Sequence, residues 1–202
     1  MSISTKLGIL FSVVLVASLS VASAQGKPQR VRAKIVALHG DVLQVERGSR
    51  TVSIELKPDT NISAVKNVSL SDVKAGTYIG APAVQGTGGK LTASALLVFP
   101  EAARGTQEGH FPYDFGATST MTNANVDAVV EATNGRELSV SYKGGRQKIV
   151  VPESVPVVTF APATRADLKA GKKVVVVAIR TPKGSFQALV LLVEKDGVVP
   201  PL

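Results

Sequence analysis

The stretch VRAKIVALHGDVLQV, Val31 to Val45, returns in altered form as VDAVVEATNGRELSV, Val126 to Val140. Both versions alternate apolar with other side chains, break near a glycine, and then alternate again. Alternation with a period of two, interrupted by a turn, predicts two half-buried strands joined by a hairpin. The two stretches lie 95 positions apart, and this offset decides how the chain is organised.

The same offset relates most of the remaining sequence. It carries the block DVKAG at 72–76 onto DLKAG at 167–171, and it persists to the end of each copy over about 70 positions without a net gap. A repeat of this length indicates two copies of one unit. We place the copies at 28–100 and 123–196, with a linker at 101–122 and a tail at 197–202.

Each copy contains short alternating runs separated by turn signals such as Gly88-Gly89 and Asn134-Gly135. We expect strands near 30–38, 41–47, 50–57, 76–86 and 90–99, and a second set 95 positions later. The DVKAG and DLKAG blocks predict one helical turn each, with Ser71 or Thr164 as the capping residue. Five strands per copy fit a small barrel, so the chain is expected to be all-β with two tandem barrels.

The first 24 residues have the composition of a secretory signal peptide. One lysine precedes an apolar run, and a small-x-small motif, Ala22-Ser23-Ala24, follows it. The run is shorter than the roughly 20 residues that a membrane-spanning helix needs. We therefore expect cleavage near Ala24-Gln25 and a periplasmic or secreted product without a stable membrane span.

The chain is basic and has no cysteine. Its formal net charge is +8, which becomes +7 once Lys6 leaves with the signal peptide. Without disulfides, stability must come from packed apolar area. Outside the cytoplasm, the expected partner is a periplasmic or envelope protein or an anionic envelope polymer. Nucleic acid is not expected, because only 4% of the residues are aromatic and stacking platforms are scarce.

No arrangement of residues predicts catalysis. The chain lacks a cysteine nucleophile, has only two histidines, and contains no glycine loop of the kind that cradles phosphate. We therefore expect a protein that is not an enzyme.

Several motifs resemble those of a known family. They are the opening V.A.I.A..G..L.V, the tripeptides Pro58-Asp59-Thr60 and Pro152-Glu153-Ser154, and the joining segment GTQEGHFPYDFGATSTMTNANV from Gly105 to Val126. By these motifs the chain resembles tandem bacterial exported domains of unassigned function, whose relatives are sometimes labelled metal transporter components. The resemblance implies a small β-barrel of OB-like topology for each copy, and it brings no catalytic residues.

The linker holds the most unusual sequence, EGHFPYDF at 108–115, which has no counterpart in either copy. One hypothesis is an aromatic seam that joins the two barrels or meets a partner, formed by Phe111, Pro112, Tyr113 and Phe115. The alternative is a divalent metal site, with Glu108, His110 and Asp114 as ligands. No other cofactor is expected.

A second candidate is a group of basic residues. Arg30, Arg32 and Lys34 alternate with apolar residues and so share the solvent face of the first strand. In the second copy the basic residues are Lys143, Arg146 and Lys148, around a hairpin. These six residues form a candidate anion-facing surface, although solvated charges also protect strand edges from aggregation.

Two functions stay open on the sequence alone. The first is a periplasmic, non-enzymatic binding or protein-interaction module, and the second is a metal-handling or metal-sensing protein that uses the His110 cluster.

Overall fold

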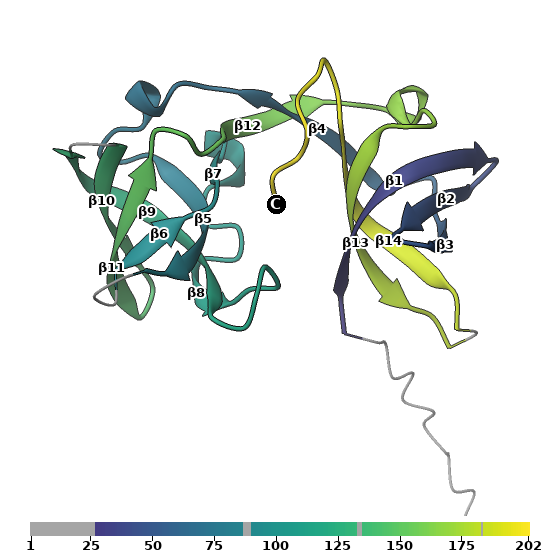
Figure 1. Ribbon diagram of the computed structural model, residues 1–202, viewed down its shortest axis with the longest axis horizontal. Coiled ribbons are helices and arrows are strands. Elements are labelled where there is room, and N and C mark those ends of the chain that lie inside the picture. The colour runs from purple at the N-terminus through teal and green to yellow at the C-terminus, as the bar shows by residue number, and fades with distance from the viewer. Residues whose placement is uncertain (1–26, 87–89, 133–134, 183) are drawn as a thin grey trace, which may run out of the picture.

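The computed structural model describes residues 27–86, 90–132, 135–182 and 184–202 (Figure 1). These residues form a fourteen-stranded system with a few short 3-10 helices, which confirms the prediction of an all-β chain. The predicted signal peptide at 1–24, the turn at Gly88-Gly89 and residue Asn134 lie outside the described residues. No helix in the described part of the chain has both the length and the hydropathy to cross a membrane.

The first group of strands closes into a five-stranded barrel, which we call the β1 ring. β1 pairs with β2 and β13, β2 pairs with β3, and β14 closes the circle by pairing in parallel with β3 and antiparallel with β13. A small five-stranded barrel is therefore confirmed. Ile35, Leu43, Ile54 and Leu191 are among the fully buried residues of its core. The strands are β1 (Gln29–His39), β2 (Val42–Arg47), β3 (Arg50–Glu55), β13 (Lys173–Arg180) and β14 (Phe186–Val193).

A second circle of pairings, the β9 ring, has the same connectivity. β9 pairs with β10 and β5, β10 pairs with β11, and β6 joins β11 to β5. Leu96, Leu138 and Ile149 are among the fully buried residues of its separate apolar core. The strands are β5 (Tyr78–Gln85), β6 (Leu91–Ala93), β7 (Leu96–Val98), β9 (Ser119–Ala132), β10 (Gly135–Tyr142) and β11 (Gly145–Pro152).

The two rings exchange strands between the copies. The β1 ring takes β1, β2 and β3 from the first copy and β13 and β14 from the second, whereas the β9 ring takes β9, β10 and β11 from the second copy and β5, β6 and β7 from the first. The exchange passes through β4 (Asn61–Asn67) and β12 (Val157–Pro162), which pair antiparallel and bridge the two rings at the top of Figure 1. The expectation that each copy closes its own barrel is therefore wrong. The ranges 28–100 and 123–196 describe the repeats of the sequence, and neither range by itself forms one ring.

The first strands of the two copies correspond at an offset of 91, not 95. Leu38 pairs with Leu43 in the first hairpin, and Val129 pairs with Leu138 in the second. Leu43 and Leu138 are 95 positions apart, whereas Leu38 and Val129 are 91 apart. Accordingly, Val130, which the 95 offset would match to a core residue of β1, is 56% exposed. A four-residue difference is even, so it preserves the alternation and leaves no trace in the sequence pattern.

Single helical turns form at Leu70–Asp72 and Arg165–Asp167, so only the first residue of each predicted block, DVKAG and DLKAG, is helical. The first turn is capped by Ser69, whose hydroxyl accepts from the N–H of Ser71, and not by Ser71 as predicted. The second is capped by Thr164. Asp72 and Asp167 each accept from the N–H of the capping residue, so these repeated carboxylates satisfy the backbone.

Candidate functional site

The linker is attached to β1 chiefly through the ion pair between Arg32 and Asp114. Strand β8 (Gly109–Pro112) pairs antiparallel with β9 and leads the following residues toward the β1 ring. There, Arg32 donates from Nη1 to Asp114 Oδ2 at 2.8 Å and from Nη2 to Asp114 Oδ1 at 2.9 Å. Its Nε donates to the main-chain oxygen of Leu202 at 3.0 Å. Arg32 therefore holds both the linker and the C-terminal tail against β1.

The aromatic rings of the linker stack on two arginines of β1. The guanidinium carbon of Arg30 lies 4.5 Å from the centre of the Tyr113 ring, and that of Arg32 lies 4.5 Å from the centre of the Phe115 ring. The two rings meet edge to face with their centres 4.9 Å apart. Cation–π contacts of this kind are attractive. Two of the residues predicted to face an anion thus lie against the linker.

The charges at this contact shift the titration of the groups involved. Hydrogen bonds from Arg32 hold the pKa of Asp114 below its ordinary value, and hydrogen bonds to Asp114 raise the pKa of Arg32. Burial raises the pKa of the Tyr113 phenol. At neutral pH the contact therefore contains a carboxylate, two guanidinium groups and an uncharged phenol.

The structure places the four predicted seam residues at different depths. Tyr113 is 6% exposed, Phe111 and Phe115 are half-buried, and Pro112 is exposed. Tyr113 belongs to an apolar cluster whose other members come from β4, β7, β9, β12, β13, β14 and the tail. The linker thus contributes one buried aromatic side chain, Tyr113, to the contact between the β1 ring and the β9 ring.

The three predicted metal ligands have three separate partners. Glu108 Oε1 accepts from the backbone N–H of Lys143 at 2.9 Å. His110 Nδ1 shares a hydrogen bond with the hydroxyl of Thr122 at 2.8 Å, and Asp114 binds the β1 guanidinium described above. Among the described residues, no group of three histidine, aspartate or glutamate side chains is arranged to hold a metal ion.

The other four predicted anion-facing residues are exposed, and they lie in two separate places. Lys34 is on β1, whereas Lys143, Arg146 and Lys148 surround the hairpin of β10 and β11. Lys148 Nζ lies 3.2 Å from Glu137 Oε1. The six basic residues therefore do not form one continuous surface.

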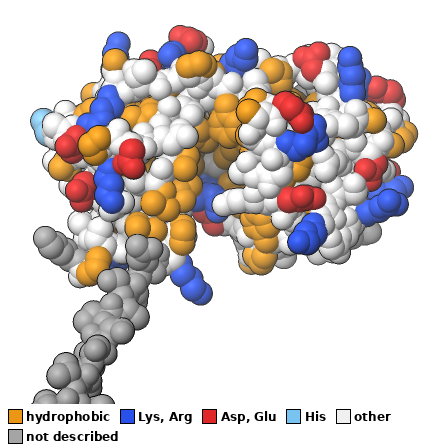
Figure 2. Space-filling view, turned by 180° about the vertical axis from the view of Figure 1, so that it is seen from behind, with side chains coloured by type: hydrophobic (Ala, Val, Ile, Leu, Met, Phe, Trp, Pro, Cys, Tyr) orange, Lys and Arg blue, Asp and Glu red, His pale blue; other side chains and the backbone are white. Residues whose placement is uncertain are grey.

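A groove of about 370 Å³ lies between the two rings, next to the aromatic cluster. Figure 2 shows hydrophobic side chains on both sides of a hollow between the two lobes. Both rings, the linker and the tail contribute to the lining, which is mostly apolar. The polar side chains of the lining, apart from the Tyr113 phenol, belong to Arg30, Thr106, Gln107 and Asn123.

Equivalent residues of the two copies line the groove together. Leu97 and Leu192 are equivalent residues, 95 positions apart, and both line it. Gly80 and Val175 form a second such pair. Both copies therefore contribute equivalent positions to the lining, and the site is asymmetric where the residues at those positions differ.

Asn123 shapes one wall of the groove. It is 5% exposed, and its Nδ2 donates to the carbonyl oxygens of Thr106 and Gln107, at 3.2 Å each. Opposite it, a Cβ on Gly80 would stand 2.8 Å from Asn123 Oδ1 and 3.0 Å from a ring carbon of Phe99. Glycine at position 80 therefore leaves room for this amide. The sequence gives no signal for Asn123, because a single asparagine within a strand has no distinctive pattern.

A β-bulge exposes two large apolar residues in the groove. The register of β14 against β13 shifts at Leu189, and both Leu189 and Val190 line the groove with 39% and 40% exposure. The equivalent residues of the first copy are Ser94 and Ala95, which are small. The exposed pair is therefore not required to build a ring, and exposed apolar side chains in a concave surface are typical of binding sites.

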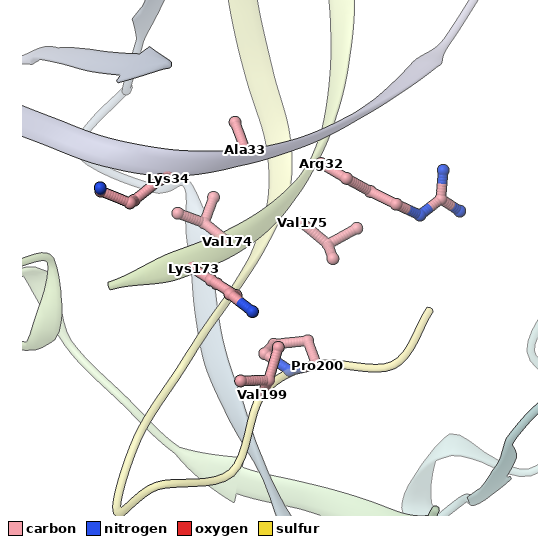
Figure 3. A pocket seen from close by; sticks show the side chains of 8 residues that line it. All are labelled: Arg32, Ala33, Lys34, Lys173, Val174, Val175, Val199 and Pro200. Atoms are coloured by element: carbon pink, nitrogen blue, oxygen red, sulfur yellow. The ribbon is translucent and has the colours of Figure 1, made fainter. Parts of the chain in front are cut away.

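A second hollow, of about 380 Å³, lies between β1, β13 and the tail (Figure 3). Lys34 and Lys173 line it from directly opposite positions of the ladder. In Figure 3 the ammonium end of Lys173 points toward Pro200, and that of Lys34 points the other way. Because the two charges diverge, they do not converge on one ligand atom, and the groove is the better candidate site.

The fold and the groove define an all-β protein with a closed five-stranded barrel and an apolar site beside it. No family model, no curated protein and no solved structure matches the chain. The resemblance to tandem exported domains accordingly stays a prediction from the motifs.

Proposed function

We propose that the chain is an exported, non-enzymatic binding module made of two OB-like barrels, and that its ligand occupies the groove between them. In this assignment β13 and β14 are the fourth and fifth strands of the first barrel, and β5 and β6 are those of the second. The parallel pairing of β3 with β14 and of β11 with β6 supports this reading.

The observation that carries the proposal is the exposed apolar lining of the groove. Leu189 and Val190 face open space beside Phe99 and Phe160, whose rings meet edge to face with centres 5.8 Å apart. Binding sites for small molecules are concave, mostly apolar and supplied with a few polar groups, with volumes of roughly 300 to 1,000 Å³. The groove agrees with each of these properties.

Export and location follow from the N-terminal sequence, and we assign the mature protein to the periplasm. Its basic surface favours loose association with an envelope protein or an anionic envelope polymer. The ligand is selected by the groove, whose lining contains few polar groups.

The test is binding of the neutral apolar fluorophore N-phenyl-1-naphthylamine to the mature protein. We expect saturable enhancement of its emission, and about tenfold weaker binding in Val190→Trp, because the indole fills the groove. Val130→Trp is the matched control, since Val130 is an exposed valine of β9 that does not line the groove. Equal binding in both variants, or no saturation in the native protein, would reject the groove as the site.

The alternative function, metal handling, has less support. Glu108, His110 and Asp114 are each engaged with a different group. Titration of Zn²⁺ into the native protein and into His110→Ala tests it directly. Heat release that is present in the native protein and lost in the variant would restore the metal hypothesis.

A further inference from the structure

We propose that the groove binds a single-chain amphiphile whose one anionic head group, a carboxylate or a phosphate, is held by Arg30. This inference deepens the proposed function and rests on it. It names the chemical class of the ligand and the residue that selects the head group.

Arg30 is the residue of the groove that is equipped for an anion. Its guanidinium lies over the ring of Tyr113, and its side chain is 30% exposed. It donates no hydrogen bond to any residue in the part of the chain that the structure describes, and its nearest carboxylate oxygen, Asp114 Oδ1, is 4.0 Å away. Arg32, by contrast, donates hydrogen bonds to Asp114 and to Leu202. Within the described residues, the N–H donors of the Arg30 guanidinium therefore make no hydrogen bond, and their ion pair with Asp114 at 4.0 Å leaves them able to bind a closer acceptor.

The charge of the lining also favours an anion. Arg30 carries the only charged side chain among the described residues that line the groove, and no aspartate or glutamate side chain is part of the lining. The equivalent of Arg30 in the β9 ring, at the offset of 91, is Met121, which also lines the groove. The groove is therefore cationic at Arg30 and apolar at the equivalent Met121. This difference suits a ligand with a charged head group at one end and an apolar chain at the other.

The apolar part of the lining suits an unbranched chain. From Arg30, the lining continues over Val177 and Val190 of adjacent strands, which pair directly with each other. It then reaches Leu189, Phe99 and other apolar residues of both rings. A volume of about 370 Å³ is at the lower end of ligand-site volumes, so it suits one chain and not the two chains of a phospholipid.

The experiment compares ligands that share a chain and differ in the head group. Dodecanoate, dodecyl phosphate, dodecanol and dodecyltrimethylammonium are titrated, below their micelle concentrations, into the mature protein by calorimetry. We expect both anions to bind about tenfold or more tightly than dodecanol, because a charge-assisted hydrogen bond to Arg30 adds to the burial of the chain. The trimethylammonium ligand is expected to bind most weakly.

Variants assign the effect to Arg30. Arg30→Gln should bring dodecanoate binding down to the level of dodecanol, and Arg30→Lys should retain part of the preference. Lys34→Gln is the matched control, because it removes one positive charge from the same strand outside the groove, and it should change the affinity less than twofold. Thermal melts check that each variant is folded.

The outcomes separate this inference from the proposed function. If dodecanol binds as tightly as dodecanoate, or if Arg30→Gln and Lys34→Gln behave alike, the assignment of Arg30 is wrong while the groove remains a binding site. If no dodecyl ligand and no N-phenyl-1-naphthylamine binds, the groove itself is rejected. Sedimentation with phosphatidylglycerol vesicles distinguishes the source of the anion. Binding to vesicles without binding of monomeric dodecanoate or dodecyl phosphate would overturn the single-chain proposal in favour of a membrane surface.

Discussion

Val65 lies directly opposite Phe160 at the centre of the antiparallel pair formed by β4 and β12. The two residues are 95 positions apart, so each faces its own counterpart in the other copy. A residue that pairs with its counterpart marks a two-fold axis, as in the self-complementary interface of a symmetric dimer. The parallel pairs Leu191 with Ile62 and Leu96 with Val157 obey the same symmetry on either side. The chain therefore has the architecture of a strand-exchanged dimer whose two subunits are joined by a linker.

The exchange can be tested with a disulfide, because the chain has no cysteine of its own. Lys34 on β1 and Lys173 on β13 are exposed and directly opposite, although they come from different copies. Opposite Cα atoms in an antiparallel pair are roughly 4.5 to 5.5 Å apart, which suits a disulfide. We expect the double variant Lys34→Cys, Lys173→Cys to form an intramolecular disulfide on oxidation, visible as faster migration in non-reducing electrophoresis.

The single-cysteine variants are the controls for this experiment. In a protein whose copies each closed their own barrel, β1 would pair with β5 instead, and Lys173 would be far from Lys34. A monomeric double variant that keeps two free thiols after oxidation would contradict the exchanged topology.

The sequence pattern could predict the class of fold but not this exchange. The alternation in β1 specifies which face of the strand is buried, and Ile35 and Leu43 would be buried against strands of either copy. Because the fourth and fifth strands of the two copies are similar, nothing in their sequence selects the partner. β4, for which the sequence pattern predicts no strand, pairs with β12 and β14 of the second copy.

The ion pair between Arg32 and Asp114 should contribute to stability in a pH-dependent way. Asp114→Asn is expected to lower the free energy of unfolding by about 1 kcal/mol at pH 7, a modest value because the two side chains are 32% and 43% exposed. The pKa of Asp114 is lowered in the folded state, so the contribution is present above about pH 4, the pKa of an unfolded aspartate, and is lost as the pH falls further. Urea denaturation at pH 7 and pH 3 measures both effects. A variant that is equally destabilised at both pH values would refute the assignment.

Tyr113 should be the energetically important residue of the linker. Tyr113→Ala removes an aromatic side chain that is 6% exposed and packed between the β1 ring and the β9 ring. We therefore expect a loss of about 3 kcal/mol in the free energy of unfolding. The exposed neighbour Pro112 provides the control, and Pro112→Ala should change stability by less than about 0.5 kcal/mol. Chemical denaturation gives both values. Similar losses in the two variants would mean that the linker acts through its backbone and not through the Tyr113 ring.

The site was harder to predict than the fold because its residues act through partners distant in sequence. Arg32 and Asp114 were assigned to two different hypotheses, an anion-facing surface and a metal site, yet they bind each other across 82 positions. Each residue has an ordinary local pattern, and only the exchanged topology brings β1 next to the linker. Leu189 and Val190 likewise have the sequence pattern of an ordinary strand, and only the β-bulge of the folded chain turns both toward the groove.

His110 should make stability depend on pH in the neutral range. Burial disfavours the charged imidazolium and lowers the pKa of His110, whose Nδ1 is joined to the fully buried Thr122 hydroxyl. An unfolded histidine binds its proton near pH 6.5, before the folded one does, so the free energy of unfolding should decrease as the pH falls below about 6.5. Urea denaturation between pH 8 and pH 5.5 measures this slope, and His110→Gln should flatten it. NMR titration of the imidazole signals, assigned with the same variant, should place the midpoint of His110 below 6.5. A midpoint above 6.5, or a slope that survives in His110→Gln, would contradict the assignment of this pH dependence to a buried His110.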